Sequence, residues 1–304
     1  MKFTSVLVTG AIGLALGGFI GAAQAEGLGG DSLASDKPIH ITAENGIEWQ
    51  QSNRVYIARG HATATRGDGS VAGDVLYAYY RPARATSTNG EQKPPSGAST
   101  LMAGTGGSTE IYRIEADGHV RFTDADRIGY GDHAVYDVDQ AVLVITGKNL
   151  RIETPRETIT ARDTLEWYDK KQIAVARGDA IATRDDRRIR GDVLTAEAEK
   201  PDNQPAKIRR VDAYGHVFVS TPDQIAQGSQ GVYDLETGIA TLIGDVKVTK
   251  GDNELTGQYA VVDTNNNVSR ILAAPPNSRT ASGGKQRVEG LLVRSPVTHT
   301  ATGQ

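Results

Sequence analysis

Three histidines occupy one repeated position and are the first residues in the chain that could do chemistry. His61, His119 and His216 each follow a glycine that opens a similar stretch of sequence. Imidazoles held in register can bind a transition metal. Other copies of the same stretch carry lysine or aspartate at this position, so a metal ladder would be incomplete. We therefore expect the position to point outward, and we predict no metal and no other cofactor.

Two pairs of carboxylates are the next candidates. Asp124 with Asp126, and Asp185 with Asp186, could act as acid and base in a hydrolysis. Both pairs lie in polar segments between apolar stretches, where aspartate favours turns, so we interpret them as solvated turn residues. The chain has no G-x-S-x-G segment, and the glycines of residues 104–107 precede no helical pattern that would make a phosphate loop. The sequence therefore predicts a protein that is not an enzyme.

Five arginines form the main basic clusters. Arg187, Arg188 and Arg190 lie close together, and Arg209 and Arg210 are adjacent. Charged side chains of this kind protect exposed strand edges from aggregation. Guanidinium groups also bind phosphate through paired hydrogen bonds, so both interpretations stay open. The whole chain has 33 basic and 37 acidic residues, a net charge of −4, which argues against a nucleic-acid partner.

The first 25 residues predict export. Lys2 is followed by an apolar, glycine- and alanine-rich stretch that ends in Ala23-Gln24-Ala25, the pattern of a cleaved signal peptide. An uncleaved membrane anchor is the alternative. The chain has no cysteine, which suits a bacterial periplasmic protein better than a small secreted domain held together by disulfides. We expect residues 26–37 to be a linker and the protein to be periplasmic.

The chain repeats itself at two scales. Glycines recur at an offset of 13 residues within a short unit, as in Gly118 and Gly131 or Gly215 and Gly228. At an offset of 118, residues 41–76 match a later segment without a gap, with 17 of 36 positions identical. This predicts a tandem duplication with halves at 38–155 and 156–272. Polar insertions at 82–109 and 199–206 are predicted loops, and 273–304 is a predicted disordered tail.

Apolar residues alternate with polar ones inside each short unit, which is typical of β-strands. Val120 and Phe122 show this period of two, and no segment has a helical period of useful length. Each unit therefore predicts two antiparallel strands, and about six units must stack to bury an apolar face. We expect the exposed edges to be the first strand, Pro38 to Thr42, and the last, Leu255 to Asp263, with Val268 to Leu272 following it.

The chain resembles the LptA/OstA family of periplasmic lipopolysaccharide-transport proteins. The resemblance rests on residues 38–44, Pro-Ile-His-Ile-Thr-Ala-Glu, and on the repeated Gly-x-Val-x-Val and Gly-Asp-x-Leu/Ala-x-Tyr-Asp patterns. It implies an all-β fold: an elongated, twisted, open β-jelly roll built here from about six two-strand repeats in a tandem duplication. It also implies an interior that holds lipid A acyl chains and head-to-tail stacking into a bridge between the two membranes.

The expected function is therefore to shield lipid A and carry lipopolysaccharide from the inner to the outer membrane. The expected partners are lipopolysaccharide, transport proteins of similar fold at both membranes, and further copies of this chain. Two alternatives are a membrane-anchored relative that receives lipopolysaccharide from the inner-membrane extractor and a β-solenoid enzyme that acts on polysaccharide. We expect the lipid groove to be lined by Val71, Leu76, Val120, Phe122, Tyr136, Leu150, Ile152, Ile159, Leu165, Ile189, Leu194, Val217, Val219, Tyr233, Val246, Val248 and Leu255. The five clustered arginines are the candidate phosphate contacts.

Overall fold

The structure is a computed structural model, and it describes residues 38–83, 109–124, 127–199, 207–263, 265–266, 268–274 and 287–293. The predicted signal peptide 1–25, the linker 26–37 and nearly all of both predicted loops lie outside these ranges. The chain divides into two compact units. The N-terminal unit holds the described residues up to Ala182 together with 195–208, and the C-terminal unit holds 183–194 and the residues from Arg209 onward.

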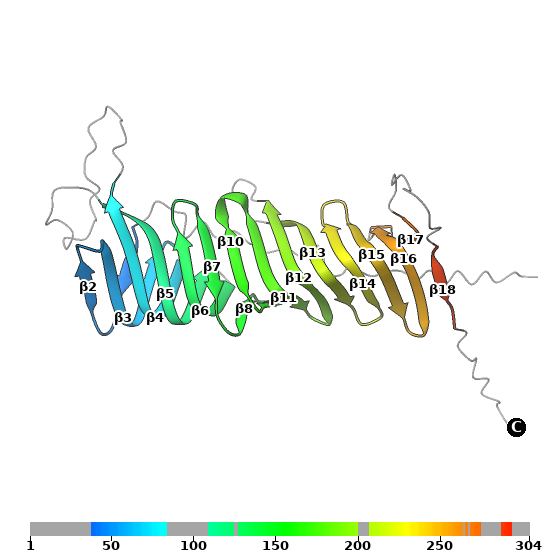
Figure 1. Ribbon diagram of the computed structural model, residues 1–304, viewed down its shortest axis with the longest axis horizontal. Helices are drawn as coiled ribbons and strands as arrows, with labels where there is room; N and C mark the ends of the chain where they lie inside the picture. The colour runs from blue at the N-terminus through cyan, green and yellow to red at the C-terminus, as the bar shows by residue number, and fades with distance from the viewer. Residues whose placement is uncertain are drawn as a thin grey trace, which may run out of the picture. The chain divides into compact units, whose positions relative to one another are not determined.

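The described residues form antiparallel strands almost throughout, as the sequence predicts, and the fold is an all-β jelly roll (Figure 1). The N-terminal unit contains β1 (His40–Thr42), β2 (Ile47–Gln50), β3 (Val55–Arg66), β4 (Gly69–Pro82), β5 (Thr109–Asp124), β6 (Arg127–Asp137), β7 (Val142–Thr146), β8 (Leu150–Glu153), β9 (Glu157–Ala161), β10 (Thr164–Tyr168) and β11 (Ile173–Arg184), with one 3-10 turn at Asp169–Lys171. The C-terminal unit contains most of β12 (Arg187–Glu199) and β13 (Lys207–Ser220), and all of β14 (Ile225–Asp234), β15 (Ile239–Lys250), β16 (Asn253–Asp263), β17 (Val268–Leu272) and β18 (Glu289–Leu291).

Alternate long strands, namely β3, β5, β11, β13 and β15, bend in their middle at a left-handed glycine that is followed by a second left-handed residue. Gly118 and His119 have φ of 74° and 45°, and Gly215 and His216 have φ of 70° and 46°. Two consecutive left-handed residues interrupt the ladder, so the register of β5 with β6 shifts between Asp117 and Val120. The bend turns one strand into two segments that belong to two facing walls. We call the segments that contain 55–59, 75–82, 109–117 and 133–137 wall A, and those that contain 62–66, 69–73, 120–124 and 127–131 wall B.

Glycine is required at the bend by packing as well as by conformation. A Cβ on Gly118 would collide with the carboxylate of Asp74, and one on Gly215 would collide with that of Asp192. The acidic residue comes from the neighbouring strand in each case. The repeated Gly-Asp and Gly-His pairs of the sequence are therefore two sides of one contact, in which the carboxylate of one strand fills the space above the bend of the next.

Aspartates end several strands, as expected for turn residues. Asp137 Oδ1 accepts a hydrogen bond from the backbone N–H of Gln140 at 2.8 Å. Asp234 Oδ1 accepts one from Thr237 at the same distance. This backbone hydrogen bond holds the pKa of Asp234 below its ordinary value.

The strand that the sequence predicts to be the exposed C-terminal edge is not exposed along its length. The predicted last edge strand, Leu255 to Asp263, is covered: β17 pairs with its second part and β18 with Glu254–Thr256. Strand β18 lies inside the stretch 273–304 that the sequence predicts to be disordered. It forms because β17 reaches only half of β16 and leaves the backbone groups of the other half to pair with β18. At the N-terminal end, β1 and β2 both pair with β3.

Two inward-facing glycines in β6 bring the walls close together. A Cβ on Gly131 would collide with Cγ2 of Ile145 and would lie 3.0 Å from the carbonyl oxygen of Thr146. One on Gly129 would lie 3.3 Å from Cδ1 of Ile145, the mobile end of that side chain. The sequence identifies Gly131 as a repeated glycine but does not predict its contact with the facing wall.

We predict that Gly131→Ala destabilises the protein by about 1–3 kcal/mol through overpacking. Gly129→Ala is the matched control on the same strand, and it should cost less because Ile145 Cδ1 can rotate away. Urea unfolding of both variants measures the difference. Equal stability of the two variants would contradict the close contact of Gly131 with the facing wall.

Candidate functional site

The inner face of the N-terminal unit carries rows of apolar side chains that cross the strands. In wall B, successive pairings join Val71, Phe122, Gly129, Ile152 and Ile159. Residues directly opposite one another in antiparallel strands point to the same face, so this row lies on one side of the sheet. It spans five strands without a charged residue.

Wall A carries a matching row. The pairings join Leu76, Ala116, Ala134, Ile145 and Leu165. Two of these five side chains are alanines, and Leu76 is 1% exposed. Small residues in one wall leave room for longer side chains of the other, as the contact of Ile145 in wall A with Gly129 and Gly131 in wall B shows.

The C-terminal unit repeats the arrangement. Val219, Ala226, Val248 and Leu255 are partners in successive pairings of β13 to β16. Of the residues predicted to line the groove, the structure buries Val71, Leu76, Val120, Tyr136, Leu150, Leu165, Ile189, Leu194, Val217, Val219, Val246 and Val248. It half-buries Phe122, Ile152, Ile159, Tyr233 and Leu255.

The interior is packed rather than open. Leu76, Val120 and Leu150 in the N-terminal unit, and Val246 and Val248 in the C-terminal unit, are less than 2% exposed. Side chains at this level of burial pack closely against their neighbours. A ligand that enters between the walls must therefore push them apart.

A narrow cavity lies between the walls of the N-terminal unit. It is lined by Ile39, Ala64, Thr65, Arg66, Val71, Ile114 and Tyr136. Burial is the main cause that raises the pKa of Tyr136 to about 12, with a further contribution from the charge of Asp169. The hydroxyl therefore keeps its proton at neutral pH.

An aromatic cluster at the N-terminal end of this unit is absent from our sequence predictions. Trp49 stacks on Tyr56 with ring centroids 5.8 Å apart, and its Nε1–H donates to Tyr80 Oη at 2.7 Å. Trp49 is 43% exposed and Ile47 is 51% exposed, although both pair with inward-facing residues of β3. The alternation that identified the groove continues through residues 47 and 49, so this pair could have been found in the sequence.

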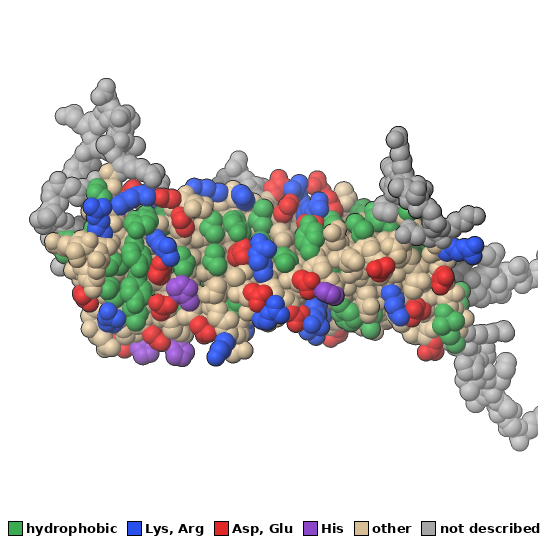
Figure 2. All heavy atoms as spheres, in the orientation of Figure 1, with side chains coloured by type: hydrophobic (Ala, Val, Ile, Leu, Met, Phe, Trp, Pro, Cys, Tyr) green, Lys and Arg blue, Asp and Glu red, His purple; other side chains and the backbone are tan. Residues whose placement is uncertain are grey.

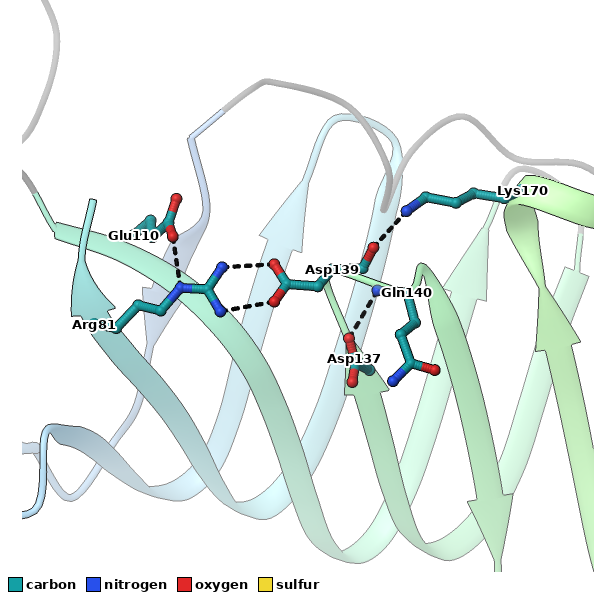
Figure 3. A network of polar contacts seen from close by, with 6 residues as sticks. All are labelled: Arg81, Glu110, Asp137, Asp139, Gln140 and Lys170. Atoms are coloured by element: carbon teal, nitrogen blue, oxygen red, sulfur yellow. Dashed lines mark hydrogen bonds and ion pairs between the residues drawn. The ribbon is translucent and has the colours of Figure 1, made fainter. Parts of the chain in front are cut away.

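A network of hydrogen bonds and ion pairs joins the ends of strands along the rim of wall A (Figure 3). Arg81 donates to both carboxylate oxygens of Asp139 at 2.7 Å and to Glu110 at 2.6 Å. Lys170 donates to the backbone oxygen of Asp139. The network ties the ends of β4 and β5 to two later turns, so it holds the rim of this wall rigid.

The five predicted arginines differ in exposure, and one of them binds a buried carboxylate. Arg210 forms two hydrogen bonds with the carboxylate of Asp212, from Nη2 at 2.7 Å and from Nε at 2.9 Å. Asp212 is 4% exposed, so this arginine neutralises a buried charge. Arg188, Arg190 and Arg209 are exposed, and Arg187 is half-buried. The four guanidinium groups other than that of Arg210 are the better remaining candidates for phosphate contact.

The interpretation of Asp124 as a solvated turn residue is wrong. The strand continues through this position, which therefore points inward, and the side chain is 5% exposed. It pairs with Arg127 at 3.4 Å across the end of the hairpin. Asp185 and Asp186 are exposed, in agreement with the turn interpretation, and Asp126 lies outside the described residues.

The three repeated histidines pair with carboxylates at the surface, where Figure 2 shows histidine side chains. Nδ1 lies 2.9 Å from Glu44 in His61, 2.9 Å from Asp74 in His119 and 3.0 Å from Asp192 in His216. Each histidine is the second left-handed residue of a bend, a conformation in which histidine, asparagine and aspartate are enriched. In the part of the chain that the structure describes, no three His, Asp or Glu side chains gather into a metal site. The bend accounts for the histidine pattern.

The fold and the apolar interior define a β-structured binding protein, and comparison with known families specifies the class. A family model described as "LptA/(LptD N-terminal domain) LPS transport protein" matches residues 40–163 and again residues 158–268. The two matches cover most of the chain, and the chain belongs to this family. Its members are lipopolysaccharide-transport components and not enzymes.

Two further comparisons do not extend the family assignment. The chain is similar to LptH, described as the LptA homologous periplasmic component of the lipopolysaccharide transport device from Pseudomonas aeruginosa, with 22% identity and a TM-score of 0.38. The match covers 45% of this chain and 95% of LptH, and at this TM-score it supports no conclusion. No curated protein matches the chain. Within the described ranges, no helix has the length and apolar character needed to cross a membrane.

We predict that the pKa of His119 falls when Asp74 is replaced by asparagine. The hydrogen bond to Asp74, followed by its charge, raises this pKa above the ordinary histidine value. The stabilisation is complete below the unfolded-state pKa and is lost as the pH rises through the folded-state pKa. NMR titration of the His119 ring protons in wild type and Asp74→Asn measures the shift. Asp68→Asn, an exposed turn variant, should leave the pKa of His119 unchanged, and an unchanged pKa in Asp74→Asn would contradict the pairing.

Proposed function

We propose that this protein is a periplasmic lipopolysaccharide carrier that shields lipid A acyl chains between its two walls and passes them along a bridge from the inner to the outer membrane. The observation that carries the proposal is the continuous apolar row across the inner face, present in both units. Membership of the transport family supports the same cargo. The proposal requires no covalent chemistry.

The energetics support an apolar cargo. Each methylene removed from water contributes about 0.8 kcal/mol, so ten of them supply about 8 kcal/mol before the cost of ordering the chain. Because the interior is packed, part of this free energy is consumed in separating the walls.

A membrane-anchored relative is the second candidate, because the apolar stretch at residues 3–25 has no charged residue. The mass of the mature N-terminus distinguishes the two. Loss of residues 1–25 supports the free carrier, and their retention supports the anchored protein.

The cargo assignment predicts that crosslinking depends on which face a residue occupies. A photoreactive residue at Phe122 or Val219, on the inner faces, should capture purified lipopolysaccharide several-fold more efficiently than one at Arg121 or Ser220. The two pairs of neighbours test one unit each, and each outward position is the control for its neighbour. Equal capture from both faces would remove the interior as the binding site.

The bridge predicts association through strand edges. Among the described residues, β1 and β2 form the N-terminal edge, and their outer backbone groups can pair with a second chain of similar fold. Ile41→Pro removes a backbone donor in β1 and should abolish concentration-dependent association in sedimentation experiments.

The matched control is Ser52→Pro, in the turn that precedes β3, where Gln51 O accepts from Arg54 N. Proline suits the second position of such a turn, so this variant should fold and associate like wild type. A wild type that stays monomeric at high concentration and binds no partner of similar fold would contradict the bridge.

A further inference from the structure

Tyr136 places a buried hydroxyl group without a partner on the inner face of the N-terminal unit. The residue is 3% exposed, and its Oη has no hydrogen-bond partner among the residues that the structure describes. Other tyrosine hydroxyls of this unit are satisfied: that of Tyr80 accepts from Trp49, and that of Tyr168 donates to Glu166. An unpaired buried hydroxyl costs free energy, which a phenylalanine of the same shape would avoid.

The surroundings of this ring are mainly apolar and belong to both walls. Tyr136 lies opposite Ile114 in β5 and Leu143 in β7. The cavity beside it is lined by Ile39, Val71 and Ile114, and also by Thr65 and Arg66. The ring therefore borders a narrow, mainly apolar slot that an entering aliphatic chain would have to widen.

The hydroxyl is a hydrogen-bond donor over the whole physiological pH range. Its pKa of about 12 keeps the proton in place. Only an acceptor that enters the slot can use this donor. Water alone is a poor occupant, since apolar surfaces supply most of the lining and a buried water needs several polar partners.

We propose that Tyr136 donates a hydrogen bond to an oxygen carried on an aliphatic chain, so that the interior prefers hydroxylated acyl chains to plain ones. This inference rests on the proposed function, because the chain must reach the interior. It adds a specificity-determining residue to an otherwise apolar site. A neutral hydrogen bond of this kind corresponds to a preference of about three- to tenfold.

The test uses two probes and three proteins. Binding of 3-hydroxymyristate and of myristate is measured by calorimetry to the full-length mature chain as wild type, Tyr136→Phe and Tyr130→Phe. Tyr130 lies on the same strand but on the outer face, where the guanidinium of Arg151 is 4.0 Å from the ring centroid. It is therefore the matched control for loss of a hydroxyl from β6.

Wild type and Tyr130→Phe should bind the hydroxylated chain about three- to tenfold more tightly than the plain one, and Tyr136→Phe should bind both equally. The melting temperature of Tyr136→Phe should equal or exceed that of wild type, since an unpaired polar atom has been removed. Equal binding of both probes by wild type, or an unchanged preference in Tyr136→Phe, would overturn the inference while leaving the carrier intact. Failure of wild type to bind either probe would overturn the proposed function and the inference with it.

Discussion

The bend in alternate long strands is the constraint on which the rest of the structure depends. Two consecutive residues must adopt left-handed conformations, which costs about 1–3 kcal/mol for a residue with a side chain. Glycine removes this cost at the first position, and histidine or aspartate tolerates it at the second, as in His119 and Asp179. At Gly118 and Gly215 the carboxylate of a neighbouring strand packs over the glycine. Because the bend recurs in every second long strand, two walls face one another within one chain.

The closeness of those walls has consequences for binding. Ile145 reaches across to the glycines of β6, so the empty interior is filled by the protein's own side chains. A preformed channel would expose apolar surface to water whenever the cargo is absent. A closed interior avoids this exposure, and under the proposed function the cargo would have to open it. The rim network around Arg81 holds one wall together while the walls separate. This division suits a carrier that must bind a lipid and also release it.

The sequence predicts the repeats, the strands and the inward-facing residues because alternation and turn chemistry are local properties. Val219 and Val248 could be assigned from their neighbours alone, and the structure places both on the inner face. The sequence does not predict the contact of Gly118 with Asp74 or the burial of Asp124, because both depend on which strand lies alongside. Strand β18 was missed for the same reason: its short, weakly patterned sequence forms a strand only because half of β16 is left uncovered. The unpaired hydroxyl of Tyr136 depends on several strands at once.

The first strands of the N-terminal unit and the last strands of the C-terminal unit are in each case two short strands, one for each wall. At the N-terminal end, β1 pairs with the wall B segment of β3 and β2 with its wall A segment. At the C-terminal end, β17 and β18 divide β16 in the same way. A partner that docks on either end therefore meets two ladders of a few residues and not one long edge. Each ladder alone is weak, so specificity must come from matching both walls together. The exposed, inward-facing Ile47 and Trp49 extend the apolar row to this end, where a partner of similar fold would continue it.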